Sequence, residues 1–158
     1  MRLSLYSAGL IPLLLTTLHG CVAVNDDSSH SDVSHFTLHT GSDPVSSSGI
    51  KSVRIITNDY DYPALLDDYS TDSTASVNFN DYQVVLIDLG LRPTDGYAIR
   101  FDSLEESDDS VLISYTMIIP EAGCSDGNVY TNPYIFEAVD SRKEILLEES
   151  LEKDSCSR

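Results

Sequence analysis

The sequence predicts an all-β domain with at most one short helix, arranged as a small antiparallel β-sandwich or barrel-like domain of about seven strands. Two observations predict this fold class. Short segments with strand-like alternation or continuous apolar runs recur from residue 35 onward, and polar, turn-forming stretches separate them. The chain is 41% hydrophobic and 22% charged, which is the composition of one globular domain.

The predicted strands follow one another along the chain. They lie at 35–39, 53–57, 82–89, 97–102, 110–119, 134–139 and 144–149. The run at 82–89, YQVVLIDL, is almost continuously apolar, which is typical of a central strand. Pro63 is followed by Leu65, Leu66 and Tyr69 at helical spacing, and this pattern predicts the short helix. The acidic stretch 104–110 is predicted to be a solvated turn.

The charge balance excludes some classes of partner. Nine Lys and Arg residues stand against 26 Asp and Glu residues, which gives a net charge of -17. Such a surface repels phosphate backbones, so we expect no nucleic-acid partner. It also disfavours adhesion to membranes through a basic patch. We interpret the acidity as a solubility feature, with a specific cation site as the alternative.

The N-terminus has the features of a bacterial lipoprotein signal peptide at 1–20. Arg2 precedes an apolar stretch that is shorter than the ~20 apolar residues a membrane-spanning helix needs. The end of the stretch, LHGC at 18–21, resembles a lipobox, with His19 where a smaller residue is usual. The resemblance implies cleavage before Cys21 and attachment of lipid to its thiol. The alternative is an ordinary secretory signal followed by a free cysteine.

Three regions follow from this assignment. After the signal peptide, residues 21–34 form a polar, flexible tether, and 35–156 form a single β domain. Val22 follows the lipidated cysteine, which by resemblance to lipoproteins of two-membrane bacteria favours the outer membrane. We therefore expect a lipid-anchored protein of the bacterial cell envelope that faces the periplasm or the cell surface. Its membrane contact is the lipid on Cys21.

A set of motifs between 79 and 156 points to a family. The motifs are Phe79-Asn80, Gly90, RPTDGY at 92–97, Pro-x-x-Gly-Cys at 120–124 and Asn132-Pro133-Tyr134. Their order resembles the C-terminal domain of the PrcB family, lipoprotein subunits associated with a bacterial surface protease complex. In that family the loop usually contains Pro-Thr-Gly-Gly-Tyr, so Asp95 replaces the first of those glycines. The resemblance implies an extracytoplasmic, non-enzymatic accessory role, with an exported protein or protease as the partner.

The loop at 92–97 is the candidate partner-binding site. Its residues are Arg92, Pro93, Thr94, Asp95, Gly96 and Tyr97. Pro93 stiffens the loop, and Gly96, with Asp95 as a second candidate, supplies a positive φ before the next strand. One interpretation is a rigid connection with Tyr97 in the core. The other is a preorganised surface that presents exposed Arg92 and Thr94 side chains to a partner.

Known catalytic motifs are missing from the sequence, so we expect no enzyme, no cofactor and no metal site. The acidic group Glu105, Glu106, Asp108 and Asp109 is a weak candidate for calcium, and a hydrated turn is the preferred interpretation. His30, His35 and His39 are interpreted as incidental surface residues.

Three functional hypotheses remain. The leading one is a lipid-anchored binding module for another exported protein. The second is a protease inhibitor, because RPTDGY is similar to a loop of chagasin-type inhibitors, which have an immunoglobulin-like fold. The third is a structural envelope lipoprotein without a specific soluble partner. The sequence leaves the oligomeric state open.

Three cysteines constrain the covalent structure. If Cys21 carries lipid, Cys124 and Cys156 remain as an even pair in an oxidising compartment. We predict a disulfide between them, with two free thiols or intermolecular pairing as the alternatives.

Overall fold

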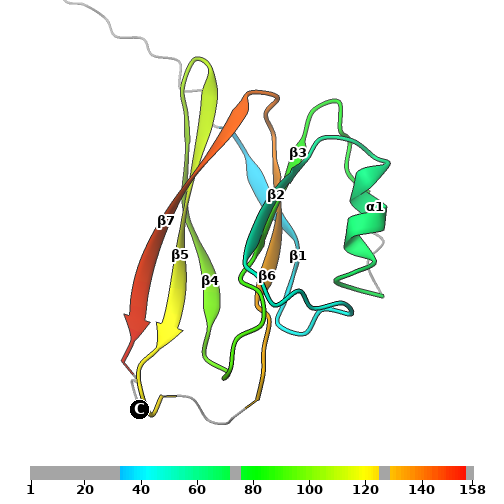
Figure 1. The fold of residues 1–158 in the computed structure, drawn as a ribbon. Helices are drawn as coiled ribbons and strands as arrows, with labels where there is room; N and C mark the ends of the chain where they lie inside the picture. The colour runs from blue at the N-terminus through cyan, green and yellow to red at the C-terminus, as the bar shows by residue number, and fades with distance from the viewer. Residues whose placement is uncertain (1–32, 72–75, 125–128, 156–158) are drawn as a thin grey trace, which may run out of the picture.

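The described residues form seven strands and one short helix, arranged as two facing sheets with the helix on the outer side of one of them (Figure 1). This computed structural model describes residues 33–71, 76–124 and 129–155. The strands are β1 (His35–Gly41), β2 (Ser52–Ile56), β3 (Gln83–Asp88), β4 (Ala98–Glu106), β5 (Ser110–Pro120), β6 (Tyr134–Val139) and β7 (Glu144–Asp154). The helix is α1 (Asp61–Leu66). The predicted fold class, a small β-sandwich of seven strands with one short helix, is confirmed.

The two sheets have the strand orders β1-β6-β3-β2 and β4-β5-β7. Every pair is antiparallel except β5 and β7, which run parallel over their whole length. The expectation of a purely antiparallel arrangement is therefore wrong at this pair. The reason is that the chain crosses to the four-stranded sheet between β5 and β7. There β6 runs back to the end of the sandwich at which β5 begins. β7 then retraces the direction of β5.

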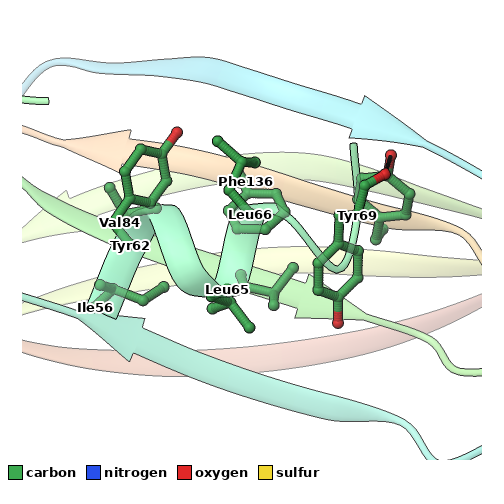
Figure 2. Packing of buried hydrophobic residues seen from close by; sticks show 9 residues of the cluster. Ile56, Tyr62, Leu65, Leu66, Tyr69, Val84 and Phe136 are labelled. Atoms are coloured by element: carbon green, nitrogen blue, oxygen red, sulfur yellow. Dashed lines mark hydrogen bonds between the residues drawn. The ribbon is translucent and has the colours of Figure 1, made fainter. Parts of the chain in front are cut away.

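Two hydrophobic clusters lie on either side of the four-stranded sheet. One fills the space between the sheets: Val85, Ile87, Val111, Ile113, Tyr115, Ile135, Val139 and Ile145. The other lies under the helix, as Figure 2 shows: Ile56, Tyr62, Leu65, Leu66, Tyr69, Val84, Leu86, Tyr134 and Phe136. Every residue of β3 and β6 is buried because a layer covers each face of these strands. This confirms 82–89 as a central strand. Leu65 and Leu66 lie on the buried side of α1, and Tyr69 is buried in the turn that follows the helix.

Two details of the strands differ from the prediction. β4 continues to Glu106 and β5 begins at Ser110, so only residues 107–109 of the predicted acidic turn at 104–110 lie outside the strands. The histidines of β1 also have partners: His35 stacks on Phe101 at 4.0 Å between ring centroids, and His39 contacts the hydroxyl of Tyr134 at 3.0 Å. Because both have partners, the interpretation of these two as incidental is wrong, although His35 is exposed as predicted and only His39 is half-buried. His30 lies outside the described residues.

The sandwich has two distinct ends, which Figure 1 shows. At one end, the Asp140 amide donates to the Ser34 carbonyl at 2.9 Å, so the start of the described chain lies beside the turn after β6. The amide of Glu144 donates to the carbonyl of Asp109 at 3.3 Å, which places the β4–β5 turn at the same end. The connection between β3 and β4 and the last residues of β5 and β7 lie at the opposite end.

Candidate functional site

Three segments pack together at the end of the sandwich opposite the start of β1. We call this surface the loop end; its segments are 42–51, 89–97 and 129–133. Leu91 donates its amide hydrogen to the carbonyl of Ser48 at 3.2 Å. Arg92 and Thr131 form an isolated antiparallel bridge, with N···O distances of 2.6 and 3.1 Å. The loop containing the predicted RPTDGY motif is therefore joined by backbone hydrogen bonds to both neighbouring segments.

A buried hydrogen-bond network lies beneath the loop end. Its centre is Asp88, the last residue of β3, which is 1% exposed. One carboxylate oxygen accepts from the hydroxyl of Tyr69 at 2.6 Å, and the other accepts from the amide of Gly90 and the side chain of Asn132. Asn132 in turn accepts from the hydroxyl of Ser47 at 2.7 Å. Burial, followed by the hydrogen bond to Asp88, raises the pKa of Tyr69, so this hydroxyl remains a donor at neutral pH.

This network explains two of the sequence motifs. The backbone amide of Asn132 also donates to the carbonyl of Ser42 at 2.7 Å, so the asparagine joins its own segment, 129–133, both to β3 and to the 42–51 segment. Gly90 has a φ of +71°, and a Cβ there would lie 2.7 Å from the carbonyl carbon of Ile50. A side chain at position 90 would be strained and would push the 42–51 segment away. Both motif residues therefore have structural roles in holding the loop end together.

The loop at 92–97 is less exposed than its polar sequence suggests. Arg92 and Thr94 are half-buried, so the expectation that both side chains are exposed is wrong. The guanidinium of Arg92 donates to the Leu89 carbonyl at 2.5 Å and lies 5.7 Å from the ring centroid of half-buried Tyr97. The Thr94 carbonyl accepts from the Thr131 hydroxyl at 3.0 Å. The guanidinium of Arg92 therefore interacts with groups of the protein itself.

The turn chemistry of this loop is partly as predicted. Gly96 has a φ of +84°, which confirms the positive φ expected there. Asp95 has no positive φ, so its candidacy for the same role is wrong. The φ of Asp95 therefore does not require a glycine. One carboxylate oxygen of Asp95 is buried without a hydrogen-bond partner in the described part of the chain. Pro93 is exposed beside them.

We expect Arg92→Ala to lower the free energy of unfolding by about 1–2 kcal/mol. The substitution removes a charge-assisted hydrogen bond and the cation–π contact with Tyr97. Urea denaturation of the full-length protein measures the change. Pro93→Ala is the neighbouring control, since its side chain is exposed, and we expect a loss of less than ~1 kcal/mol there. Equal stability of the Arg92 variant and the wild type would contradict the structural role.

The side chains that the loop end does expose are apolar. The structure has eleven exposed large hydrophobic residues among those described, and five of them belong to the three loop-end segments. They are Val45, Ile50, Leu91, Val129 and Tyr130, with exposures between 44% and 77%. Sequence reasoning missed these residues because they follow no strand or helix period. Their signal is only that apolar residues occur in stretches otherwise rich in Ser, Gly, Pro and Asn.

The remaining predicted sites are only partly covered by the structure. Cys21 and Cys156 lie outside the described residues, as do the signal peptide and most of the tether. Cys124 closes a turn after β5, with its amide donating to the Glu121 carbonyl at 2.9 Å. Within the described ranges, no group of three His, Cys, Asp or Glu side chains is arranged to hold a metal ion. In the same ranges, no helix has the length and hydropathy needed to span a membrane.

Comparison with known proteins finds a family model that matches the middle part of the β domain. The model of the family described as PrcB C-terminal matches residues 83–140, which confirms the resemblance found in the sequence. The matched segment includes Asp88, Gly90 and Asn132, the residues that join the loop end to the core. No curated protein and no solved structure matches the chain. The domain boundaries outside the matched segment stay predictions.

Proposed function

We propose that this chain, with its PrcB C-terminal match at 83–140, is a lipid-anchored envelope protein that acts as a non-enzymatic accessory module. It binds another exported protein through the loop end. By the family resemblance, that partner is a component of a protease complex. The observation that carries the proposal is the concentration of exposed apolar side chains on three segments that a buried network holds in place.

The rigidity of the loop end supports a binding role. Association costs free energy for every loop and side chain that must be ordered in the complex. Here the Asp88 network and the Arg92–Thr131 bridge order the backbone before a partner arrives. The exposed side chains on this backbone include Tyr130, at 68% exposure, and aromatic residues are enriched at binding hot spots. The surface is therefore preorganised and apolar, in a chain whose net charge is -17.

The position of the loop end also suits a tethered protein. The described chain begins at the opposite end of the sandwich, next to the turns that follow β4 and β6. A tether that leaves from there places the loop end away from the membrane, where a partner can reach it. Lipid supplies the attachment, since each buried methylene contributes ~0.8 kcal/mol and two or three acyl chains hold the protein on a bilayer.

The loop-end proposal is tested by two matched double variants. We expect Leu91→Ser with Tyr130→Ser to reduce capture of the partner from the cell envelope by about thirty-fold or more, because each lost side chain removes ~1 kcal/mol or more of contact. Capture is quantified by mass spectrometry after cross-linking of the full-length protein in its membrane. The control is Leu146→Ser with Tyr60→Ser; Leu146 has the same 44% exposure as Leu91, and Tyr60 is 86% exposed.

The control variant is expected to capture the same proteins as the wild type, and both variants are expected to unfold at the wild-type urea concentration. Equal capture by the loop-end variant and the wild type would place the binding surface elsewhere. The absence of any specifically captured protein with the wild type would favour the structural envelope lipoprotein instead.

The lipid anchor is tested separately. We expect growth with a labelled fatty acid to label the wild-type protein and to leave Cys21→Ala unlabelled and released from the membrane fraction. The reason is that Cys21 carries the only thiol in the lipobox-like segment. Cys124→Ala is the control and should be labelled like the wild type. Labelling of Cys21→Ala at the wild-type level would refute the anchor.

A further inference from the structure

The edge of strand β2 lacks the features that protect the other edges of the sandwich. Within the described chain, β2 pairs only with β3, in an unbroken register from Ser52 to Ile56. Edge strands are usually blunted by bulges or by charge, because their unpaired backbone groups otherwise recruit another strand. The edge strands β1 and β4 each contain a register shift, and β7 carries five carboxylates in eleven residues. β2 has no register shift, and its only charged residue is Arg54.

On the side of β2 that faces the other sheet, apolar side chains are exposed. Val53 and Ile55 pair with Ile87 and Val85, which belong to the cluster between the sheets. The alternating sequence pattern predicts that these core-facing side chains are buried. Val53 is nevertheless 37% exposed and Ile55 is 43% exposed. The sandwich is therefore incompletely covered along β2.

The opposite sheet shows the same gap. Tyr115 belongs to the cluster between the sheets, and its hydroxyl donates to Glu149 of β7 at 2.6 Å. Leu151 lies two residues after Glu149, on the same face of β7, and is 63% exposed. Lys51, the residue before β2, forms an ion pair with Glu149 of β7 at one end of this side. The side of the sandwich between β2 and β7 is thus open, and an additional strand beside β2 would cover Val53, Ile55 and Leu151.

The other face of β2 carries an unpaired cation. Arg54 makes no hydrogen bond or ion pair with any residue in the described part of the chain. It lines a pocket of about 400 Å³ with Asp61, Ala64, Leu65 and Asp68 of the helical segment. The carboxylate of Asp61 accepts from the side-chain amide of Asn58 at 2.8 Å rather than from Arg54. A carboxylate brought to this edge from outside would be the natural partner of the guanidinium.

We propose that β2 is a strand-addition site that takes an extended polypeptide segment of a partner protein. The added strand pairs with the free edge of β2 through backbone hydrogen bonds. Its side chains alternate, with apolar residues packing on Val53 and Ile55 and an acidic residue between them pairing with Arg54 over the pocket. The occupant is thus an extended segment with the pattern apolar–acidic–apolar.

A second copy of this chain fits the same edge less well. Antiparallel pairing of two β2 strands centred on Arg54 would place two guanidinium groups directly opposite each other, which is destabilising. Each copy also carries a net charge of -17, and the two copies would repel each other. The inference stands apart from the loop-end proposal, because it concerns a different surface and is tested with peptides rather than by capture.

The probe is a pentapeptide with blocked ends whose central aspartate is flanked by two valines on each side. We expect it to bind the full-length protein saturably in a fluorescence anisotropy titration, and to slow amide hydrogen exchange in Ser52–Ile56 but not in β7. Replacing the central aspartate by lysine should weaken binding by about ten-fold or more, because the like charge faces Arg54. Replacing the flanking valines by proline should abolish binding, since proline donates no backbone hydrogen bond.

Three protein variants complete the test. Ile55→Lys places a charge on the open side and should abolish binding, and Arg54→Glu should reverse the preference from the aspartate peptide to the lysine peptide. Leu146→Lys is the matched control, at 44% exposure against 43% for Ile55, and should bind like the wild type. Thermal unfolding confirms that each variant is folded before binding is compared.

Several results would overturn the proposal. They are failure of the aspartate peptide to bind the wild type, equal binding of the proline peptide, unchanged binding by Ile55→Lys, and slowed exchange in β7 instead of β2. Sedimentation analysis covers the remaining alternative. A dimer of the wild type that Ile55→Lys converts to a monomer would make a second copy the occupant, and that result also overturns the proposal.

Discussion

Replacing Asp88 by leucine is expected to lower the free energy of unfolding by roughly 3–5 kcal/mol. Leucine is close in size but accepts no hydrogen bond. It would leave the Tyr69 hydroxyl, the Gly90 amide and the Asn132 side-chain amide without their acceptor in a site that is 1% exposed. Each buried donor without a partner costs about 1–3 kcal/mol, so three of them exceed the effect of most single substitutions. Urea denaturation of the full-length protein measures the loss.

Two control variants separate the network from simple packing. Asp88→Asn keeps one oxygen acceptor of nearly the same shape, so we expect a smaller loss of about 1–2 kcal/mol. Ser47→Ala removes only the outermost hydrogen bond of the network, to Asn132, and should cost about 1 kcal/mol. If Asp88→Leu unfolds within ~1 kcal/mol of the wild type, the network does not hold the loop end, and the preorganisation argument fails with it.

The elements that the sequence predicts well are those decided by local pattern. The apolar run at 82–89 became β3, buried on both faces, because the layer on each side needs an apolar surface. The helical spacing of Leu65, Leu66 and Tyr69 predicts the short helix, because these side chains pack in the same hydrophobic cluster under it. Seven strands follow from seven segments of this kind, and the fold class follows from their number and length.

The parts that the sequence did not predict depend on contacts between distant segments. The parallel pairing of β5 and β7 depends on β6 joining the other sheet. The local sequence of β7 does not indicate the strand with which β7 pairs. The exposure of Val53 and Ile55 depends on which strands flank the sandwich, whereas their alternation predicts only that they share a face. Edge position is a property of the assembled sheet.

The candidate site shows the same division. Arg92 and Thr94 stand in a polar loop, and a polar loop residue is expected in solvent unless something distant covers it. Here Thr131, almost forty positions away, holds the loop backbone through hydrogen bonds to the backbone of Arg92 and the carbonyl of Thr94. In the loop held this way, the guanidinium of Arg92 turns to the Leu89 carbonyl and the Tyr97 ring. The motif residues Gly90 and Asn132 could be recognised from the sequence, but their shared partner Asp88 could not be distinguished among 26 acidic residues.

The predicted disulfide acquires a geometric basis from the parallel strands. The last pair between β5 and β7 joins Pro120 to Asp154, and the amide of Glu121 donates to the carbonyl of Asp154 at 3.2 Å. Cys124 follows three residues later, in the turn closed by its own hydrogen bond to Glu121. Cys156 lies two residues beyond Asp154, outside the described residues. The ends of β5 and β7, from which the chain continues to the two cysteines, thus lie side by side.

Removing this bond with Cys124→Ser and Cys156→Ser is expected to lower the free energy of unfolding by roughly 3–4 kcal/mol. In the chain-entropy account, the bond would close a loop that runs from β5 through the loop end and β6 to the end of β7, and the unfolded chain would regain that freedom. Urea denaturation of the non-reduced protein measures the change, and Cys21→Ala is the control because it leaves the pair intact. Non-reduced digests should contain the linked peptides. Alkylation of both cysteines without reductant would show that the pair does not form, and the double variant should then unfold like the wild type.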